Sequence, residues 1–366
     1  MCGSGRLRSK EMLNLTLRCF LGSLLALGSL LAAPSAGAQD LPSAPDSLGV
    51  DDFGSFGNAD ATESRPYASQ KVLSQSPTKL ISVGYEYQLP FDITSVGPHT
   101  VGVGELEERT EPVDRFAGLR LGFNAPVISN SSLILNLGLT YWNTGVGIAN
   151  ANRTPLFRAM EDGLRSTGFN ATVFKPLNDV RYLLIQGNVD LNGTYRNFDD
   201  VSSKALTYSG TAIYGWKRSE AFMWGLGLTR TYRAGQLLHI PVVYYYRTFN
   251  PKWGLEAVFP ARVNLRRSFG ANSLLTIGYE IEGNAYYLGM VNGQDAYLRR
   301  GELKPRLTYE RQLAGFVWLS AQAGYRYNYR FNVFNDQNPT GDNNPLYDNS
   351  LGNPLYFNLS INLVSP

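Results

Sequence analysis

The feature that most constrains this chain is a long series of segments in which apolar and polar residues alternate. About a dozen such runs follow residue 78, each roughly ten residues or more, which is the length of a membrane-crossing strand. Successive side chains of a strand point to opposite faces, so each run has one apolar and one polar side. In the clearest run the apolar face holds Val317, Leu319, Ala321, Ala323, Tyr325, Tyr327, Tyr329 and Phe331. The polar face holds Ser320, Gln322, Gly324, Arg326, Asn328, Arg330 and Asn332. Among strand structures, only a closed barrel satisfies every backbone group in lipid, so the pattern predicts a barrel.

Residues 1–38 are typical of a cleaved export signal. Four basic residues precede an apolar stretch from Phe20 to Ala33, and Ala36-Gly37-Ala38 supplies small residues at a cleavage site. The alternative is a retained membrane anchor. The stretch is short for a span, is interrupted by glycine and serine, and ends at Pro34, so we favour the cleaved signal.

Composition then excludes several classes of function for the mature chain. Both cysteines, Cys2 and Cys19, precede the cleavage site, which excludes thiolate catalysis, disulfides and zinc–sulfur sites. Removal of the signal takes four of the 33 basic and one of the 30 acidic residues, leaving 29 of each. This balance gives no indication of a nucleic-acid partner.

Three regions follow from the pattern: the signal at 1–38, a flexible periplasmic segment at 39–78 and a barrel at 79–366. The middle segment is rich in Ser, Pro, Asp, Gly and Ala and lacks periodicity. Thirteen runs have strand character: Leu80–Leu89, Phe116–Phe123, Ser132–Trp142, Leu164–Lys175, Arg181–Arg196, Lys204–Trp216, Phe222–Arg233, Leu237–Phe249, Trp253–Arg267, Ser273–Tyr287, Glu302–Leu313, Phe316–Val333 and Leu355–Val364.

Thirteen cannot be the final number, because bacterial single-chain barrels have even strand counts. Either one run is not a full strand or a short strand near Thr100–Gly104 is missing. We expect an all-β transmembrane antiparallel barrel of about 12 strands, with 14 as the next choice. Three long connections, Pro90–Glu111, Asn143–Asp162 and Asn335–Pro354, should be extracellular loops, yet strict alternation of thirteen runs cannot place all three at one end.

The polar face carries acids and bases on neighbouring strands, a pattern that favours charge ladders inside a lumen. The alternative is a soluble periplasmic β-protein whose polar face is solvated. Lysines such as Lys175, Lys217, Lys252 and Lys304 sit mostly near expected turns, whereas a soluble sheet would spread them along the strands. The predicted lumen-facing residues are Glu256, Arg262, Arg266, Glu280, Glu282, Arg306, Glu310, Arg326 and Arg330.

Three segments, Trp253–Ala261, Gly278–Asn284 and Tyr309–Arg326, resemble an uncharacterised Gram-negative outer-membrane β-barrel family, known as a domain of unknown function. The resemblance covers about Lys79 to the end of the chain and is densest over Pro241–Phe331. It implies a barrel fold and an outer-membrane location, and it implies no catalytic residues.

A search for catalytic chemistry finds little. A barrel lipase or acyltransferase would need a histidine close to a serine, and neither His99 nor His239 has one at suitable spacing. Glu280 and Glu282 share a face, as an acid–base pair would, but neighbouring arginines favour a structural ladder. We expect no enzymatic activity and assign no catalytic, cofactor-binding or metal-binding residue.

We therefore expect an outer-membrane barrel of a Gram-negative bacterium that forms a narrow, porin-like channel for small solutes. The alternatives are a plugged structural or loop-binding barrel without conductance and, less favoured, a barrel lipase or acyltransferase. Expected partners are outer-membrane lipids and lipopolysaccharide, with the barrel-assembly machinery and periplasmic chaperones during biogenesis. The sequence leaves the oligomeric state open.

Overall fold

The computed structural model describes residues 69–99, 106–151, 154–338 and 344–365. The expected signal, most of the segment at 39–78 and the possible strand near Thr100–Gly104 lie outside these residues. Everything described belongs to one compact unit, Gly57–Pro366.

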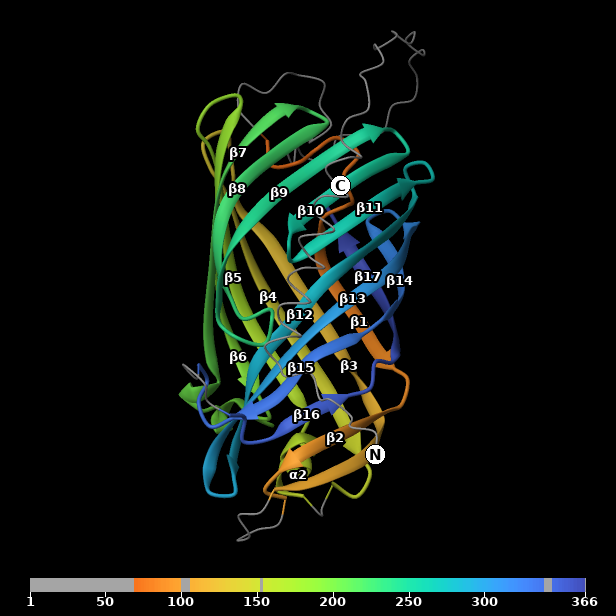
Figure 1. Ribbon diagram of the computed structural model, residues 1–366. Helices are drawn as coiled ribbons and strands as arrows, with labels where there is room; N and C mark the ends of the chain where they lie inside the picture. Colours follow the sequence, from red (N-terminus) through yellow and green to blue (C-terminus); the bar gives the residue numbers. More distant parts are fainter. Residues whose placement is uncertain (1–68, 100–105, 152–153, 339–343, 366) are drawn as a thin grey trace, which may run out of the picture. The chain divides into compact units, whose positions relative to one another are not determined.

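Strands account for most of the described chain (Figure 1). The first nine are β1 (Lys79–Gln88), β2 (Phe91–Gly97), β3 (Glu107–Ser129), β4 (Ile134–Ile148), β5 (Leu164–Pro176), β6 (Arg181–Gly193), β7 (Leu206–Ser219), β8 (Phe222–Thr231) and β9 (Leu238–Asn250). The remainder are β10 (Trp253–Phe259), β11 (Arg262–Ser268), β12 (Ser273–Val291), β13 (Gln294–Ala314), β14 (Val317–Tyr325), β15 (Tyr327–Phe334), β16 (Asp348–Leu351) and β17 (Leu355–Val364). The helices are α2 (Pro155–Glu161) and the short 3-10 turns η2 (Phe198–Asp200) and η3 (Ser203–Ala205).

Fourteen strands close into one antiparallel ring, which confirms a transmembrane-type antiparallel β-barrel. Strand β1 pairs with β3 on one side and with the last strand, β17, on the other, so the ring is complete. Strands β2, β15 and β16 continue β1, β14 and β17 beyond a break in each, and add no members to the ring. The preferred count of 12 was too low, and the second choice of 14 is confirmed.

The error lies in the run Trp253–Arg267, which the sequence pattern presents as one strand. It is a hairpin of two short strands, β10 and β11, which pair from Trp253↔Arg267 to Val258↔Arg262. Pro260 is a turn-forming residue, but the turn at Pro260-Ala261 lacks the additional glycine, asparagine or aspartate that would strengthen the signal. One extra reversal makes the count even, and all three long connections then fall at the same end of the barrel.

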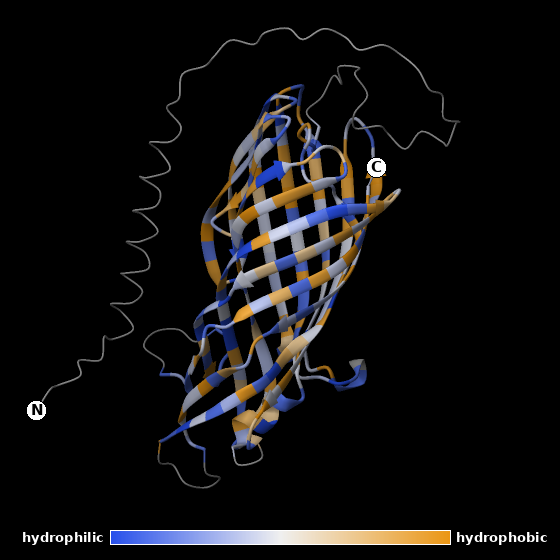
Figure 2. Ribbon diagram, turned by 90° about the vertical axis from the view of Figure 1, so that its right-hand side faces the viewer, coloured by the Kyte–Doolittle hydropathy of each residue, from blue (hydrophilic) through white to orange (hydrophobic). Residues whose placement is uncertain are grey.

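The outer face of the barrel is apolar and the inner face is polar over much of its length. Figure 2 shows the alternation as successive blue and orange bands along the strands. Exposed apolar side chains recur at every second position of β1 and β17: Ile81, Val83, Tyr85, Tyr87, Leu355, Phe357, Leu359, Ile361 and Leu363. Burying such a surface in lipid is favourable by about 25 cal/mol per Å² of apolar area.

The two ends of the barrel differ in construction. Strands meet in short turns at one end, where β1 begins and β17 ends, and we call it the short-turn end. The opposite, long-loop end holds the connections at 98–106, 149–163 and 335–347, and α2 lies there beside β2 (Figure 1). Thr154 caps α2 by accepting a hydrogen bond from the Phe157 amide, and Pro155 starts the helix without needing an amide partner.

Within the described ranges, no helix is both long and apolar enough to cross a membrane.

Candidate functional site

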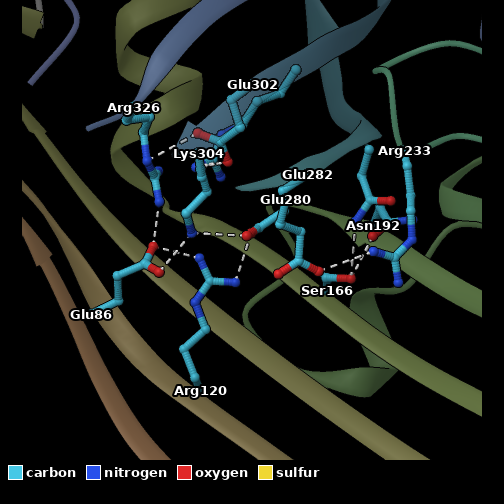
Figure 3. A network of polar contacts seen from close by, with 12 residues as sticks. Glu86, Arg120, Ser166, Asn192, Arg233, Glu280, Glu282, Glu302, Lys304 and Arg326 are labelled. Carbon is cyan, nitrogen blue, oxygen red and sulfur yellow. Dashed lines mark hydrogen bonds and ion pairs between the residues drawn. The ribbon is translucent and has the colours of Figure 1, made fainter. Parts of the chain in front are cut away.

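Seven charged side chains meet inside the barrel between its two ends, and we call them the central ion cluster (Figure 3). They come from β1, β3, β12, β13 and the break between β14 and β15, so the cluster joins strands from around the ring. Its members are Glu86, Arg120, Glu282, Arg300, Glu302, Lys304 and Arg326.

Two cations bridge two carboxylates at the centre of the cluster. The guanidinium of Arg120 contacts Glu86 at 2.6 Å and Glu282 at 2.9 Å. The ammonium of Lys304 contacts the same two carboxylates, each at 2.9 Å. Each carboxylate thus faces at least two cations, an arrangement that offsets part of the cost of removing the charges from water.

Arg326 extends the cluster toward the long-loop end. Its guanidinium contacts Glu86 and, at 3.0 Å, Glu302, which also pairs with Arg300 at 3.0 Å. Glu302 is 0% exposed and Arg326 is 1% exposed, so these pairs have little access to solvent. Removing one partner from such a pair costs about 3–5 kcal/mol, because the other charge stays buried without compensation.

The backbone register explains why so many cations gather here. Glu282 and Glu302 lie directly opposite each other on β12 and β13, and like charges at that spacing repel. Four cations of the cluster face three carboxylates, so the repulsion is more than balanced. Aromatic rings also stack on the cations: Trp142 lies 4.3 Å from Arg120, and Tyr356 lies 4.4 Å from Lys304.

A polar cavity of about 550 Å³ lies on the short-turn side of this cluster. We call it the chamber. Its wall is formed by β1, β3, β9–β14 and β17, and Arg120 of the central ion cluster is part of its lining. Charged, hydroxyl and amide side chains dominate that lining, so the chamber suits water and hydrophilic solutes.

The chain before β1 lies across the mouth of the chamber. This segment, Ser69–Thr78, is called the strap, and it is the last part of the predicted periplasmic segment at 39–78. The Ser76 amide donates to Glu256 of β10 at 2.9 Å, and the Leu73 amide donates to the Glu220 carbonyl oxygen at 2.8 Å. Val72, 4% exposed, packs into a cluster of inward-facing apolar and aromatic side chains from β5–β9.

The long-loop end of the lumen has a different filling. Leu156 and Phe157 of α2 are both 0% exposed, and they pack with side chains from β2–β5, β12, β13 and β15 in one apolar core. This core lies on the far side of the central ion cluster from the chamber. Within the described residues, apolar side chains therefore fill the part of the lumen between these strands.

The structure places most of the nine predicted lumen residues around the chamber and the cluster. Glu282 and Arg326 belong to the central ion cluster. Four more line the chamber: Glu256, Arg262, Arg306 and Glu310. The buried Arg266 pairs with Glu256 at 3.1 Å, and Glu280 pairs with Arg306 at 2.5 Å.

Arg330, the ninth residue, lies apart from both groups. It pairs with Gly301, whereas Asn328 pairs with Glu302, so Tyr329 is an extra residue in β15. This bulge reverses the predicted alternation after Tyr329, whose own side chain is still exposed. Phe331, predicted on the apolar outer face, is buried in the core around α2, and Arg330 donates to the Ala234 carbonyl oxygen at 3.0 Å.

Sequence reasoning did not include five members of the cluster among its site residues: Glu86, Arg120, Arg300, Glu302 and Lys304. Alternation did place Glu86 and Arg120 on polar faces, but each was a single charge in its strand. Lys304 shares the polar face of its run with Arg306 and Glu310, but the sequence places it near a turn, because β13 is expected to begin at Glu302. The strand in fact begins at Gln294, so Lys304 lies within the wall and is 2% exposed.

The two histidines lie in unrelated surroundings. His99 is buried, and its Nε2 lies 3.0 Å from the Ser95 carbonyl oxygen, while its ring packs near Phe157 and Tyr347. Burial lowers the pKa of the His99 imidazole below its usual 6.5. His239 is an exposed residue of β9.

Solved structures with a similar strand arrangement are outer-membrane proteins. An outer-membrane channel from Pseudomonas putida F1 is 14% identical, with 80% of this chain and 97% of that chain covered and a TM-score of 0.34. The Pseudomonas putida toluene transporter TodX is 10% identical, covering 86% and 98%, with a TM-score of 0.34. A Pseudomonas aeruginosa FadL homologue is 10% identical, covering 80% and 91%, with a TM-score of 0.38.

Curated protein sequences gave no match to the chain. The model of one protein family, described as a domain of unknown function (DUF6268), matches residues 148–363. That range includes β12, β13 and β17 and most of the charged residues discussed above. The resemblance read from the sequence to an uncharacterised barrel family is confirmed. This chain belongs to the DUF6268 family.

Proposed function

We propose that the protein is a channel of the Gram-negative outer membrane for small polar solutes, and that its lumen is closed in the conformation described. The apolar outer face supports a place in a bilayer, where outer-membrane lipids and lipopolysaccharide would cover it. Short turns of such barrels face the periplasm, so the strap and the chamber would open toward the periplasm. The proposal includes no catalytic step.

The polar chamber is the observation that carries the proposal. A barrel with a purely structural role can fill its lumen with apolar side chains, as the core around α2 does at the other end. Here about 550 Å³ of polar space remains, and the central ion cluster closes it on one side. Buried ion pairs add little net stability compared with apolar packing, but they can respond to charge, solutes or voltage.

A plugged structural or loop-binding barrel is the second candidate. The apolar core around α2 favours it, because displacing that core would expose many buried side chains to water. The two candidates differ in ion conductance. A plugged barrel does not conduct, even when residues of the central ion cluster are substituted.

Single-channel recording of the mature protein, Gln39–Pro366, in a planar bilayer tests the proposal. We expect brief, rare openings of the native protein, with insertion verified by heat-modifiable gel mobility. The double variant Glu280→Gln with Glu282→Gln removes two lumen carboxylates, so it should open more often and prefer anions more strongly. Glu108→Gln, an exposed position of β3, is the matched control and should behave as the native protein.

If neither the native protein nor the double variant conducts ions although both insert into the bilayer, the plugged barrel would be favoured. A conducting double variant with unchanged ion selectivity would show that Glu280 and Glu282 lie away from the conduction path.

A further inference from the structure

The charges that line the chamber are nearly all paired with one another. Lys79 pairs with Glu310 at 2.5 Å, and Glu256 pairs with Arg266 at 3.1 Å. Arg306 pairs with Glu280 at 2.5 Å, and Arg120 belongs to the central ion cluster. These pairs account for every charged residue of the chamber lining except Arg262.

Arg262 is the exception because the carboxylate nearest to it in the sheet is already occupied. It lies directly opposite Glu280 in the β11–β12 ladder. The two oxygens of Glu280 face Arg233 at 3.2 Å and Arg306 at 2.5 Å. Within the described part of the chain, no carboxylate comes within ion-pair distance of Arg262. Its guanidinium donates one hydrogen bond, at 3.3 Å, to the hydroxyl of Tyr246.

A guanidinium carries five N–H donors in a planar fork that matches a carboxylate, and among the described residues the Arg262 side chain has one acceptor, the Tyr246 hydroxyl. The neutral side chains around the chamber offer both donors and acceptors. They include Asn264, Thr276, Gln322 and Asn358. A ligand with several hydroxyl groups could use these partners, whereas an apolar ligand would leave them without hydrogen bonds.

We propose that the chamber binds a small polyhydroxylated carboxylate, such as a sugar acid, with Arg262 as the group that pairs with its carboxylate. The volume of about 550 Å³ lies within the range of small-molecule sites. Arg262 is the one cation of the chamber lining without a described carboxylate at ion-pair distance, which suits a ligand with a single carboxylate. This inference rests on the proposed channel function and adds the class of solute that would enter from the short-turn end.

Isothermal titration calorimetry of the detergent-refolded mature barrel with gluconate tests the site. Sorbitol serves as the uncharged counterpart of similar length and hydroxyl content. We expect saturable binding of gluconate and at least tenfold weaker binding of sorbitol. Arg262→Gln should weaken gluconate binding at least tenfold, whereas Arg267→Gln, an exposed residue of the same strand, should leave it unchanged. Heat-modifiable gel mobility checks that each variant is folded.

Equal gluconate affinity of native protein and Arg262→Gln would overturn the proposal, as would equal affinity for gluconate and sorbitol. Absence of saturable binding to the folded native protein at 50-fold molar excess and millimolar concentration would also overturn it. Calorimetry does not require an open pore. A barrel that conducts without binding gluconate would contradict this inference alone, and one that binds gluconate but never conducts would contradict the channel alone.

Discussion

The two ends of the lumen are closed by different physical means. At the long-loop end, α2 and the ends of the surrounding strands form an apolar core that excludes water. At the short-turn end, the strap covers a polar chamber, and the central ion cluster forms the boundary between the two regions. The apolar core and the central ion cluster are both buried, but only the cluster consists of charged side chains.

This difference predicts which end can open. Close-packed apolar side chains lose contacts and expose surface when they separate, so the core around α2 should stay closed under ordinary conditions. Ion pairs can exchange partners with a charged solute or with water at lower cost, provided that every charge finds a new partner. Val72 is the one buried apolar side chain among the described residues of the strap, and segments with so little buried apolar surface can open locally.

The largest expected effect is at Glu302. Glu302→Ala would leave Arg300 buried without its carboxylate and would remove one of the two carboxylates that Arg326 contacts. We expect the free energy of unfolding to fall by about 3–5 kcal/mol, measured by urea unfolding in lipid vesicles. Glu108→Ala, at an exposed position, should change it by less than about 0.5 kcal/mol. Similar losses for the two variants would show that the cluster adds nothing to stability.

A somewhat smaller loss is expected in the apolar core. Leu156→Ala in α2 creates a cavity at a fully buried position and should lower the free energy of unfolding by about 3 kcal/mol. Arg158→Ala on the exposed side of the same helix is the control. The same urea experiment should give a Leu156→Ala effect that is insensitive to salt, because no charge is involved. A strong dependence on salt would contradict the apolar character of this closure.

The next prediction concerns the free energy of opening the strap, which should fall by about 1.6 kcal/mol when Val72 is shortened. Val72→Ala removes two buried methyl groups, each worth about 0.8 kcal/mol, so the strap should leave its place roughly ten times more often. Hydrogen exchange of the Leu73 amide, which donates to the Glu220 carbonyl oxygen, reports this opening. Leu73→Ala, at a side chain that is 54% exposed, is the matched control. Unchanged exchange in Val72→Ala would show that the backbone contacts alone hold the strap.

The smallest effect concerns pH at the long-loop end. Burial lowers the pKa of the His99 imidazole in the folded protein below the value of about 6.5 expected in the unfolded chain. The stability that depends on neutral His99 is therefore present above pH 6.5 and is lost as the pH falls below it, by at most about 1.4 kcal/mol per pH unit. Thermal unfolding at pH 8 and pH 5 measures this loss.

His99→Gln should reduce that pH dependence, and His239→Gln, at an exposed histidine, should preserve it. A pH dependence that is identical in all three proteins would assign it to other groups.

Much of the fold could be predicted because alternation acts over short distances. In β1 and β17 every second residue is apolar, which identifies the outer face of each strand. The same alternation predicts that Arg262, Arg306 and Glu310 lie on the inner face, where the chamber is. The prediction failed where a reversal or a bulge has only a weak local signal. Pro260-Ala261 reverses the chain between two strands of matching pattern, and Tyr329 shifts the phase of β15 by one residue.

The sequence by itself determined that this protein is a barrel with an apolar exterior and a charged interior, since each strand carries its own alternation. Only the tertiary structure decided which charges meet. Glu86 and Lys304 are 218 residues apart, and their contact at 2.9 Å depends on ring closure and on the register of each strand pair. The same closure leaves Arg262 without a carboxylate, because Glu280, its neighbour in the ladder, is held by arginines from elsewhere in the chain.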